Sequence, residues 1–339
     1  MAKINLLTIH WGNCYGAVFQ TYATCKMLEE LGHEVTVINL IHNKVRAKFK
    51  HLKEYTNLLA HYQFWCFKRR YFPQMTKKMF VLDKQLLPDA DYTIIGSDQV
   101  WNRNITSYQA LNYFGDFADN KLVALSSSFG RKTWTEDSEY TNVVKSLLDR
   151  FVAISVREDS AVDILKDQFD LSSIQLLDPT LAYGKFLPLV KQGKRNNKVF
   201  CFTYNSTGEV GQIKIEVASA LNLNLQPENF FTRRLNASPM DWLNNIYSSE
   251  FVITDSFHGV AFCLIYKKNF VVLCANKEKF TRLESLLKKV NLQNRVIQSL
   301  EDLHQRKEML FEKIDYTKVD EILNQEREIY KEFLLKVIK

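Results

Sequence analysis

Short apolar runs alternate with segments of helical length along the chain. The run from Ile4 to Ile9 is typical of a buried strand, and the helix predicted from Ala17 to Leu31 stops at Gly32 before a second strand in "EVTVINL". Together they form one βαβ unit of about forty residues, which implies a parallel sheet with a right-handed crossover.

The same alternation continues to the C-terminus. Later predicted strands end in "DYTIIGSDQVW", "KLVALSSSFG", "FVAISVREDSA" and "SSIQLLDPTL". A second series begins near Lys198 with "KVFCFTYN", after the hydrophilic segment 190–198, which is the best candidate for a linker. A helix is predicted to open at Ser238 and Pro239, and an amphipathic helix is predicted over 319–338.

Two successive series predict an α/β protein with two Rossmann-like domains that face each other across a cleft. We expect an N-terminal domain over 1–189, with a basic helical excursion at 43–80, and a C-terminal domain over 190–339. The two would join near residues 185–198, and the last helix would pack back toward the first domain. A chain of 339 residues is long enough for two cores, since single cores stop growing at roughly 250–300 residues.

Composition narrows the class of protein. The apolar content of 46% and the charged content of 24% fit a globular protein and exclude disordered or collagen-like chains. The apolar run in Met1 to Leu7 is too short for a signal peptide and no segment is long enough to span a bilayer, so we expect a cytoplasmic protein. Six scattered cysteines without a C-x-x-C pair favour reduced thiols, and we expect no metal.

The positive charge is unevenly distributed. Between Asn43 and Phe80 lie ten Lys or Arg residues and a single acid, Glu54, interleaved with aromatic residues. One interpretation is a solvated helical excursion that covers a domain edge. The other is a surface that contacts an anionic membrane or another polyanion.

The stretch "FVITDSFHGVAF" places three polar residues between two apolar segments. Asp255, Ser256 and His258 fall in the turn between a predicted strand and a predicted helix. Asp255 or Ser256 could cap that helix, and the free N–H groups of its first turn would then form an anion site beside His258. Each residue alone also has an ordinary explanation, because Asp and Ser are common caps and most histidines are ordinary polar residues.

Other unusual polar residues also follow predicted strand ends. They are Gly12, Asn13 and Gly16, then Ser97 and Asp98, then Ser126 to Ser128, Arg157 and Asp178. Ligands of open parallel sheets bind at this edge, so the clustering predicts a site there. Lys279 and Arg282 follow a further strand and could add an anion contact, although solvated surface charge is the commoner explanation for each.

Several short motifs occur in a specific order. With "NCYGAVFQTYA", "IIGSDQVWN", "SVREDSA", "LDPTL" and "SPMDWLNNIYSSEFVITDSFHGVAF", the chain resembles the polysaccharide pyruvyl transferase family from Asn13 to about Arg295. The resemblance implies a GT-B-like fold and the transfer of the enolpyruvyl unit of phosphoenolpyruvate to a sugar. The usual product is a ketal on a cell-surface polysaccharide precursor of an exopolysaccharide or capsule.

The resemblance also implies roles for particular residues. His258 would carry the proton, with Asp255 or Asp98 orienting it or binding acceptor hydroxyls. Arg157 would chelate one anion of the donor and converge with His258 on one pocket between the domains. Further donor contacts would come from Ser256, Gly259, Lys279 and Arg282, and acceptor or loop contacts from Asn13, Gly16, Ser97, Ser127 and Asp178.

The first domain would then serve the acceptor, a sugar or a lipid-linked oligosaccharide, and the second would serve the donor. No cofactor and no nucleic acid partner are expected. Two alternatives stay open: a nucleotide-sugar glycosyltransferase on the same scaffold, and a non-catalytic subunit of a polysaccharide assembly complex. The presence of His258 and Arg157 argues against the second.

Overall fold

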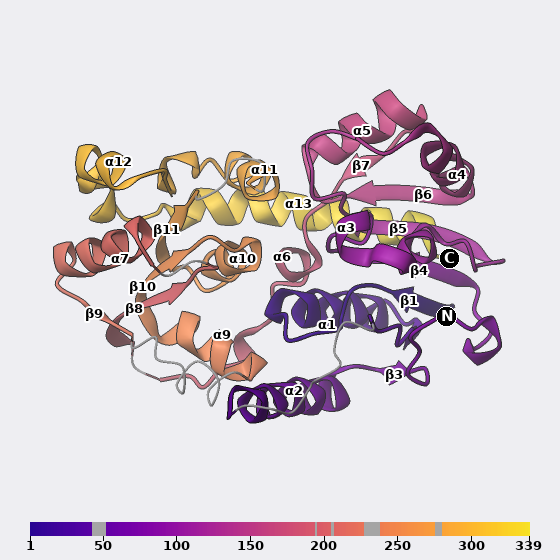
Figure 1. Cartoon of the computed structure of the whole chain (residues 1–339), viewed down its shortest axis with the longest axis horizontal. Coiled ribbons are helices and arrows are strands. Elements are labelled where there is room, and N and C mark those ends of the chain that lie inside the picture. The colour runs from indigo at the N-terminus through magenta and orange to yellow at the C-terminus, as the bar shows by residue number, and fades with distance from the viewer. Residues whose placement is uncertain (43–51, 194, 205–206, 227–237, 275–279) are drawn as a thin grey trace. The chain divides into compact units, whose positions relative to one another are not determined.

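The computed structural model describes residues 1–42, 52–193, 195–204, 207–226, 238–274 and 280–339, with the side chains of 52–57 left aside (Figure 1). The chain forms two compact units. The first comprises Met1–Lys48, Cys66–Tyr183 and Gln325–Lys339, and the second comprises Phe49–Trp65 and Gly184–Asn324. Each unit is built on its own parallel sheet with helices, so the chain is an α/β protein of two Rossmann-like units.

The first unit holds a seven-stranded parallel sheet in the order β3-β2-β1-β4-β5-β6-β7. Ile4 pairs with Val35 on one side and with Tyr92 on the other, so β1 lies between β2 and β4. The strand order reverses between β1 and β4, the position where sheets of this kind bind ligands. The strands are β1 (Lys3–Leu7), β2 (Glu34–Val37), β3 (Gln74–Met75), β4 (Tyr92–Ile95), β5 (Lys121–Ser127), β6 (Phe151–Val156) and β7 (Ile174–Gln175).

Aromatic residues form much of the core of the first unit. Trp101 is 2% exposed, its ring stacks on that of Phe114 at 5.6 Å, and the Phe129 ring lies tilted against it at 4.9 Å. The helices between residues 15 and 183 are α1 (Tyr15–Glu30), α2 (Leu52–Tyr71), α3 (Arg103–Thr106), α4 (Ser138–Leu148), α5 (Asp159–Phe169) and α6 (Pro179–Tyr183), with 3₁₀ segments at Lys84–Leu86 and Ser107–Phe114. Of these helices, α2 begins in the second unit and ends in the first. The last helix, α13 (Tyr316–Val337), begins in the second unit and ends in the first.

The second unit holds a five-stranded parallel sheet in the order β12-β11-β10-β8-β9. The central strand β10 is buried along Phe251 to Thr254 and pairs with β8 and β11. The strands are β8 (Asn196–Phe202), β9 (Asn224–Leu225), β10 (Ser249–Thr254), β11 (Asn269–Leu273) and β12 (Val296–Ile297). The helices are α7 (Glu209–Ala220), α9 (Pro239–Ser248), α10 (Phe257–Ile265), α11 (Thr281–Lys289) and α12 (Leu300–Gln305), with 3₁₀ segments at Leu187–Leu189, Gln293–Arg295 and Lys307–Leu310.

The predicted elements are present with shifted ends. The first helix begins at Tyr15, two residues before its predicted start, and β8 begins at Asn196, inside the segment predicted as a linker. The basic excursion contains the long helix α2 and the short strand β3, whereas its residues 43–51 lie outside the described part. Among the helices that the structure describes, none is both long and apolar enough to cross a membrane.

Candidate functional site

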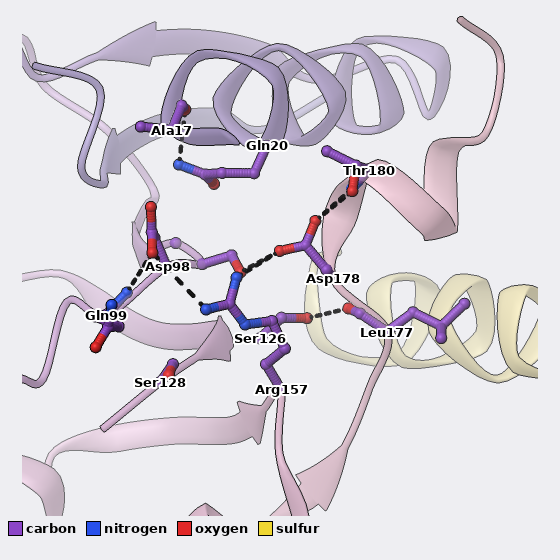
Figure 2. Close-up of polar contacts among 12 residues, drawn as sticks. Ala17, Gln20, Asp98, Gln99, Ser126, Ser128, Arg157, Leu177, Asp178 and Thr180 are labelled. Atoms are coloured by element: carbon purple, nitrogen blue, oxygen red, sulfur yellow. Dashed lines mark hydrogen bonds and ion pairs between the residues drawn. The ribbon is translucent and has the colours of Figure 1, made fainter. Parts of the chain in front are cut away.

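Three charged side chains meet at the carboxyl edge of the first sheet (Figure 2). Asp98 follows β4, Arg157 follows β6 and Asp178 follows β7. The Arg157 guanidinium donates to the Asp178 carboxylate at 2.7 Å and forms an ion pair with Asp98 at 3.7 Å. The structure therefore brings together three residues that are up to 80 positions apart in the chain (178 − 98).

The Asp178 carboxylate is held on both of its oxygens. One oxygen accepts hydrogen bonds from the Thr180 amide at 2.9 Å and the Thr180 hydroxyl at 2.6 Å, and the other accepts from Ser97 Oγ at 3.2 Å and from Arg157. Its side chain is 0% exposed. Asp178 thus fixes the orientation of Arg157 and is closed to solvent.

Asp98 differs from Asp178 in backbone and exposure. Its φ of 76° lies in the left-handed region, which Asp tolerates better than most residues but at some cost in energy. Its carboxylate accepts a hydrogen bond from the Gln99 amide at 2.8 Å and its side chain is 12% exposed. Of the two carboxylates beside Arg157, only Asp98 reaches solvent.

A chain of hydrogen bonds holds the segment that carries Asp98. Gln20 in α1 donates to Thr8 Oγ1 at 2.9 Å, and Thr8 Oγ1 donates to the Ser97 carbonyl at 2.8 Å. Ser127 Oγ donates to the carbonyls of Ile95 and Gly96, both at 3.1 Å. Ser127 was predicted as an acceptor or loop contact, but its buried hydroxyl is engaged with backbone, which indicates a structural role.

Arg157 is almost completely enclosed. Its side chain is 1% exposed; burial opposes its charge, but Asp178, and after it Asp98 and Glu158, raise its pKa above the ordinary value. Two carboxylates and one guanidinium leave a formal charge of −1 on this cluster, which would repel a trianionic donor. The Asp178 carboxylate accepts from Nη1 of the guanidinium, and the donor-binding role of Arg157 stays a prediction.

Three buried residues of the first unit were not predicted as site residues. His10 follows β1, is 0% exposed, and neither ring nitrogen has a hydrogen-bond partner within the described residues. Burial, and then Lys68, lower its pKa to about 3. Glu158 accepts from Ser128 Oγ at 2.7 Å, and Tyr330 of α13 has its pKa raised by burial and by nearby Asp178. A signal existed for His10 and Glu158, which both follow predicted strands.

The loop after β1 carries the predicted residues Asn13 and Gly16. Asn13 is exposed, and Gly16 is buried in the first turn of α1. Cys14 is the N-cap residue of that helix without a side-chain capping bond. Of the two residues, only Asn13 presents its side chain to solvent at this edge.

In the second unit, the start of α10 sits directly against the end of β10. Ser256 is the N-cap, and its hydroxyl accepts from the Gly259 amide at 3.5 Å. Thr254 Oγ1 accepts from the Ser256 amide at 3.1 Å and donates to the Phe202 carbonyl at 2.7 Å. A Cβ on Gly259 would meet Thr254 Oγ1 at 2.3 Å, so the close approach requires glycine.

The other two polar residues of "TDSFHG" differ in their surroundings. His258 lies in the first turn of α10 and is 7% exposed. Both Asp255 oxygens accept from the Tyr204 amide, at 2.9 and 3.1 Å, so Asp255 binds the loop that follows β8. Burial raises the pKa of Asp255, while the Tyr204 amide and the charge of Lys214 oppose that rise.

Lys214 is a positively charged residue that was not predicted as part of the site. It lies in α7, is 5% exposed, and is close enough to Asp255 for its charge to lower the pKa of that carboxyl. Nothing in the amphipathic pattern of α7 marks it, since lysines on surface helices are ordinary. Of the two predicted cations, Arg282 lies in the first turn of α11 and Lys279 lies outside the described residues.

Comparisons with known proteins identify the family and the fold of the chain. Residues 15–275 match the family model described as polysaccharide pyruvyl transferase. The S. aureus MnaA–UDP co-structure shares 11% identity and a TM-score of 0.53, with 99% of this chain and 95% of that chain covered. A Listeria monocytogenes structure described as a UDP-N-acetylglucosamine 2-epimerase shares 14% identity and a TM-score of 0.57, with the same coverage. Curated proteins gave no significant match. The likenesses show a GT-B-like fold.

Proposed function

The chain belongs to the polysaccharide pyruvyl transferase family and is therefore a transferase, and from this premise we propose that it moves the enolpyruvyl group of phosphoenolpyruvate to a sugar as a ketal. The proposed acceptor is a cell-surface polysaccharide precursor, free or lipid-linked, and the proposed location is the cytoplasmic side of the membrane. The observation that carries the proposal is the start of α10, where Ser256, His258 and Gly259 lie together at the end of β10.

The donor is assigned to the second unit because of its charge. Phosphoenolpyruvate carries a phosphate and a carboxylate, and both need N–H donors or cations. The first turn of α10 offers backbone N–H groups at the positive end of a helix dipole, and Lys214 adds a buried positive charge nearby. Arg282 at the start of α11 is a further candidate for the second anion.

Ketal formation sets the proton requirements. The methylene carbon of the donor gains a proton, two acceptor hydroxyls add to the adjacent carbon, and phosphate leaves, so each hydroxyl must lose its proton. One of these protons balances the new methyl group and the other leaves with phosphate or solvent. Imidazole is the usual carrier for such transfers near neutral pH, and His258 is the proposed carrier at this helix start.

The acceptor is assigned to the first unit, where Asp98 is the partly exposed carboxylate. A carboxylate can accept a hydrogen bond from a sugar hydroxyl and take its proton during addition. Arg157 and Asp178 would then act as positioning residues that hold Asp98 in its left-handed conformation. This revises the predicted role of Arg157 while keeping it in the same reaction.

A second candidate function is a reaction on a nucleotide sugar, because the S. aureus structure of similar fold contains UDP. The two candidates are separated by measuring the melting temperature with phosphoenolpyruvate and with UDP-sugars. A ligand at 100 times its dissociation constant adds about 2.7 kcal/mol to the free energy of unfolding. A higher melting temperature with phosphoenolpyruvate alone supports pyruvyl transfer, and a higher one with a UDP-sugar alone supports the second candidate. A melting temperature that neither ligand raises supports a non-catalytic subunit.

A further inference from the structure

Helix α2 has an aromatic side that packs into the protein. Phe64 is 2% exposed and Phe67 is 4% exposed. The Phe67 ring lies 5.3 Å from that of Phe19 and 6.2 Å from that of Tyr22, and Tyr71 lies 6.1 Å from Tyr22. This side accounts for how α2 is held against α1.

A second apolar stripe runs along the opposite side of α2. Leu58 is 41% exposed, Tyr62 is 60% exposed and Trp65 is 48% exposed, and Arg69 continues the same line. Steps of four, three and four residues keep these side chains on one side of a helix with 3.6 residues per turn, about half a turn away from Phe64 and Phe67. The Tyr62 and Trp65 rings stack at 5.8 Å. A surface helix normally presents polar side chains here, so an exposed aromatic stripe marks an interaction surface.

The surroundings of this stripe are strongly basic. Lys68, Arg69 and Arg70 occupy the last turn of α2. Lys78 lies near Lys68, whose pKa is lowered by burial and then by the charge of Lys78. In the sequence, no Asp or Glu occurs between Leu58 and Val81. The partner must therefore accept aromatic and cationic side chains together.

We propose that the α2 stripe, Leu58, Tyr62, Trp65 and Arg69, seats the chain on the surface of an anionic phospholipid bilayer. Trp and Tyr concentrate at the boundary between headgroups and acyl chains, and clustered Lys and Arg are drawn to anionic headgroups. Charge selects this partner over a second copy of the chain, since two such basic faces would repel each other. The inference rests on the proposed function in one respect: a lipid-linked acceptor would be met at that surface.

Vesicle co-sedimentation tests the proposal with phosphatidylcholine vesicles that contain or lack phosphatidylglycerol. We expect the chain to bind the anionic vesicles. Replacing Arg69→Gln and Arg70→Gln together should lower the partition coefficient about 25-fold, about fivefold for each lost charge. The matched control Lys331→Gln with Lys336→Gln removes two exposed charges from α13 and should leave binding unchanged.

The apolar part of the stripe needs its own variant. Replacing Tyr62→Gln and Trp65→Gln should lower binding to anionic vesicles at least tenfold, whereas Ile215→Gln with Leu335→Gln, at positions 61% and 54% exposed, should not. Circular dichroism melting confirms that each variant is folded. The proposal is overturned by equal binding to both vesicle types, by indifference to both α2 variants, or by a dimer that the α2 variants dissociate. The assay contains no phosphoenolpyruvate, so a failure here is distinct from a failure of the proposed transferase activity.

Discussion

Both units place polar residues after the carboxyl ends of parallel strands, but the two groups of residues differ in charge. At the first sheet, Asp98 and Asp178 both pair with Arg157, so two negative groups face one positive group. At the second sheet lie the first turn of α10 and the carboxylate of Asp255, and the positive charge of Lys214 is close to that carboxylate. This difference in charge is the reason for the proposed assignment of the acceptor to the first unit and of the donor to the second.

The clusters also differ in how they are held. The first is built from side chains that hold one another, so Arg157 and Asp178 support Asp98 from within the protein. The second is built from backbone, because Gly259 lets α10 approach Thr254 closely and Ser256 caps the helix. A cluster of mutually dependent charges should be sensitive to the loss of any member, whereas a backbone cluster should be sensitive mainly to shape.

The largest expected effect is a loss of turnover when His258, in the second cluster, is replaced. His258→Ala should lower kcat by about 10²–10⁴ and leave phosphoenolpyruvate binding measurable, since a proton carrier acts mainly on the transition state. Steady-state kinetics on an identified acceptor, together with the melting shift by phosphoenolpyruvate, measures both. The control His304→Ala removes an exposed histidine of α12 and should change neither. Wild-type turnover by His258→Ala would remove the basis for the pyruvyl-transfer mechanism.

The next effect concerns stability at the first cluster. Arg157→Ala leaves a buried Asp178 without its charged partner and should lower the free energy of unfolding by about 3–5 kcal/mol. Arg157→Lys should lose less unfolding free energy than Arg157→Ala, because the lysine ammonium keeps the charge but lacks the planar fork of the guanidinium. Urea denaturation measures both variants.

The control for this pair is Lys84→Ala, because the Lys84 and Asp119 side chains are 54% and 83% exposed and form an ion pair at 3.1 Å. An exposed pair contributes only about 0–1 kcal/mol. Equal losses of unfolding free energy for Arg157→Ala and Lys84→Ala would show that the buried cluster is no more interdependent than a surface ion pair.

Sequence patterns predicted the strands and helices that a contiguous run of residues specifies. The strands that begin at Lys3, Tyr92 and Ser249 contain apolar runs typical of a buried strand, and the helix opened by Ser238 and Pro239 has its cap and its proline in place. Strands β9 and β12 were not predicted. Each has two residues, too few to show a period, and each forms because a neighbouring strand offers its edge.

The candidate site was predictable only in part, for a similar reason. Residues that follow strand ends could be found because a parallel sheet brings those ends together. The burial of Arg157 between two carboxylates could not, since it depends on how three loops pack. Lys214 comes from the middle of a helix and Tyr204 contributes a backbone amide, and neither leaves a trace in a sequence pattern.

A smaller effect tests whether the first unit excludes further positive charge. Burial lowers the pKa of His10 to about 3, so the folded protein holds it neutral while the unfolded chain protonates it near its ordinary pKa of 6.5. Above pH 6.5 His10 is neutral in both the folded and the unfolded state and does not change the free energy of unfolding. As the pH falls from 6.5 toward 3, the free energy of unfolding decreases by about 1.4 kcal/mol per pH unit. Urea denaturation at pH 6.5 and pH 5 should show a flatter pH dependence for His10→Phe, by about 2 kcal/mol over that interval. The exposed-site control His304→Gln should retain the wild-type loss, and an unchanged slope for His10→Phe would contradict the assignment.

The last prediction tests the backbone nature of the second cluster. Gly259→Ala places a methyl group where a Cβ would lie 2.3 Å from Thr254 Oγ1, and that hydroxyl cannot move freely because it donates to Phe202 and accepts from Ser256. Either the α10 start or β10 must shift, which should cost about 1–3 kcal/mol of unfolding free energy and displace His258. The matched control is Gly193→Ala, where no atom lies within 4 Å of the added Cβ and stability should stay within about 0.5 kcal/mol. If the two substitutions cost the same in urea denaturation, the close approach of α10 to β10 is not what shapes this cluster, and its contrast with the side-chain cluster of the first sheet is lost.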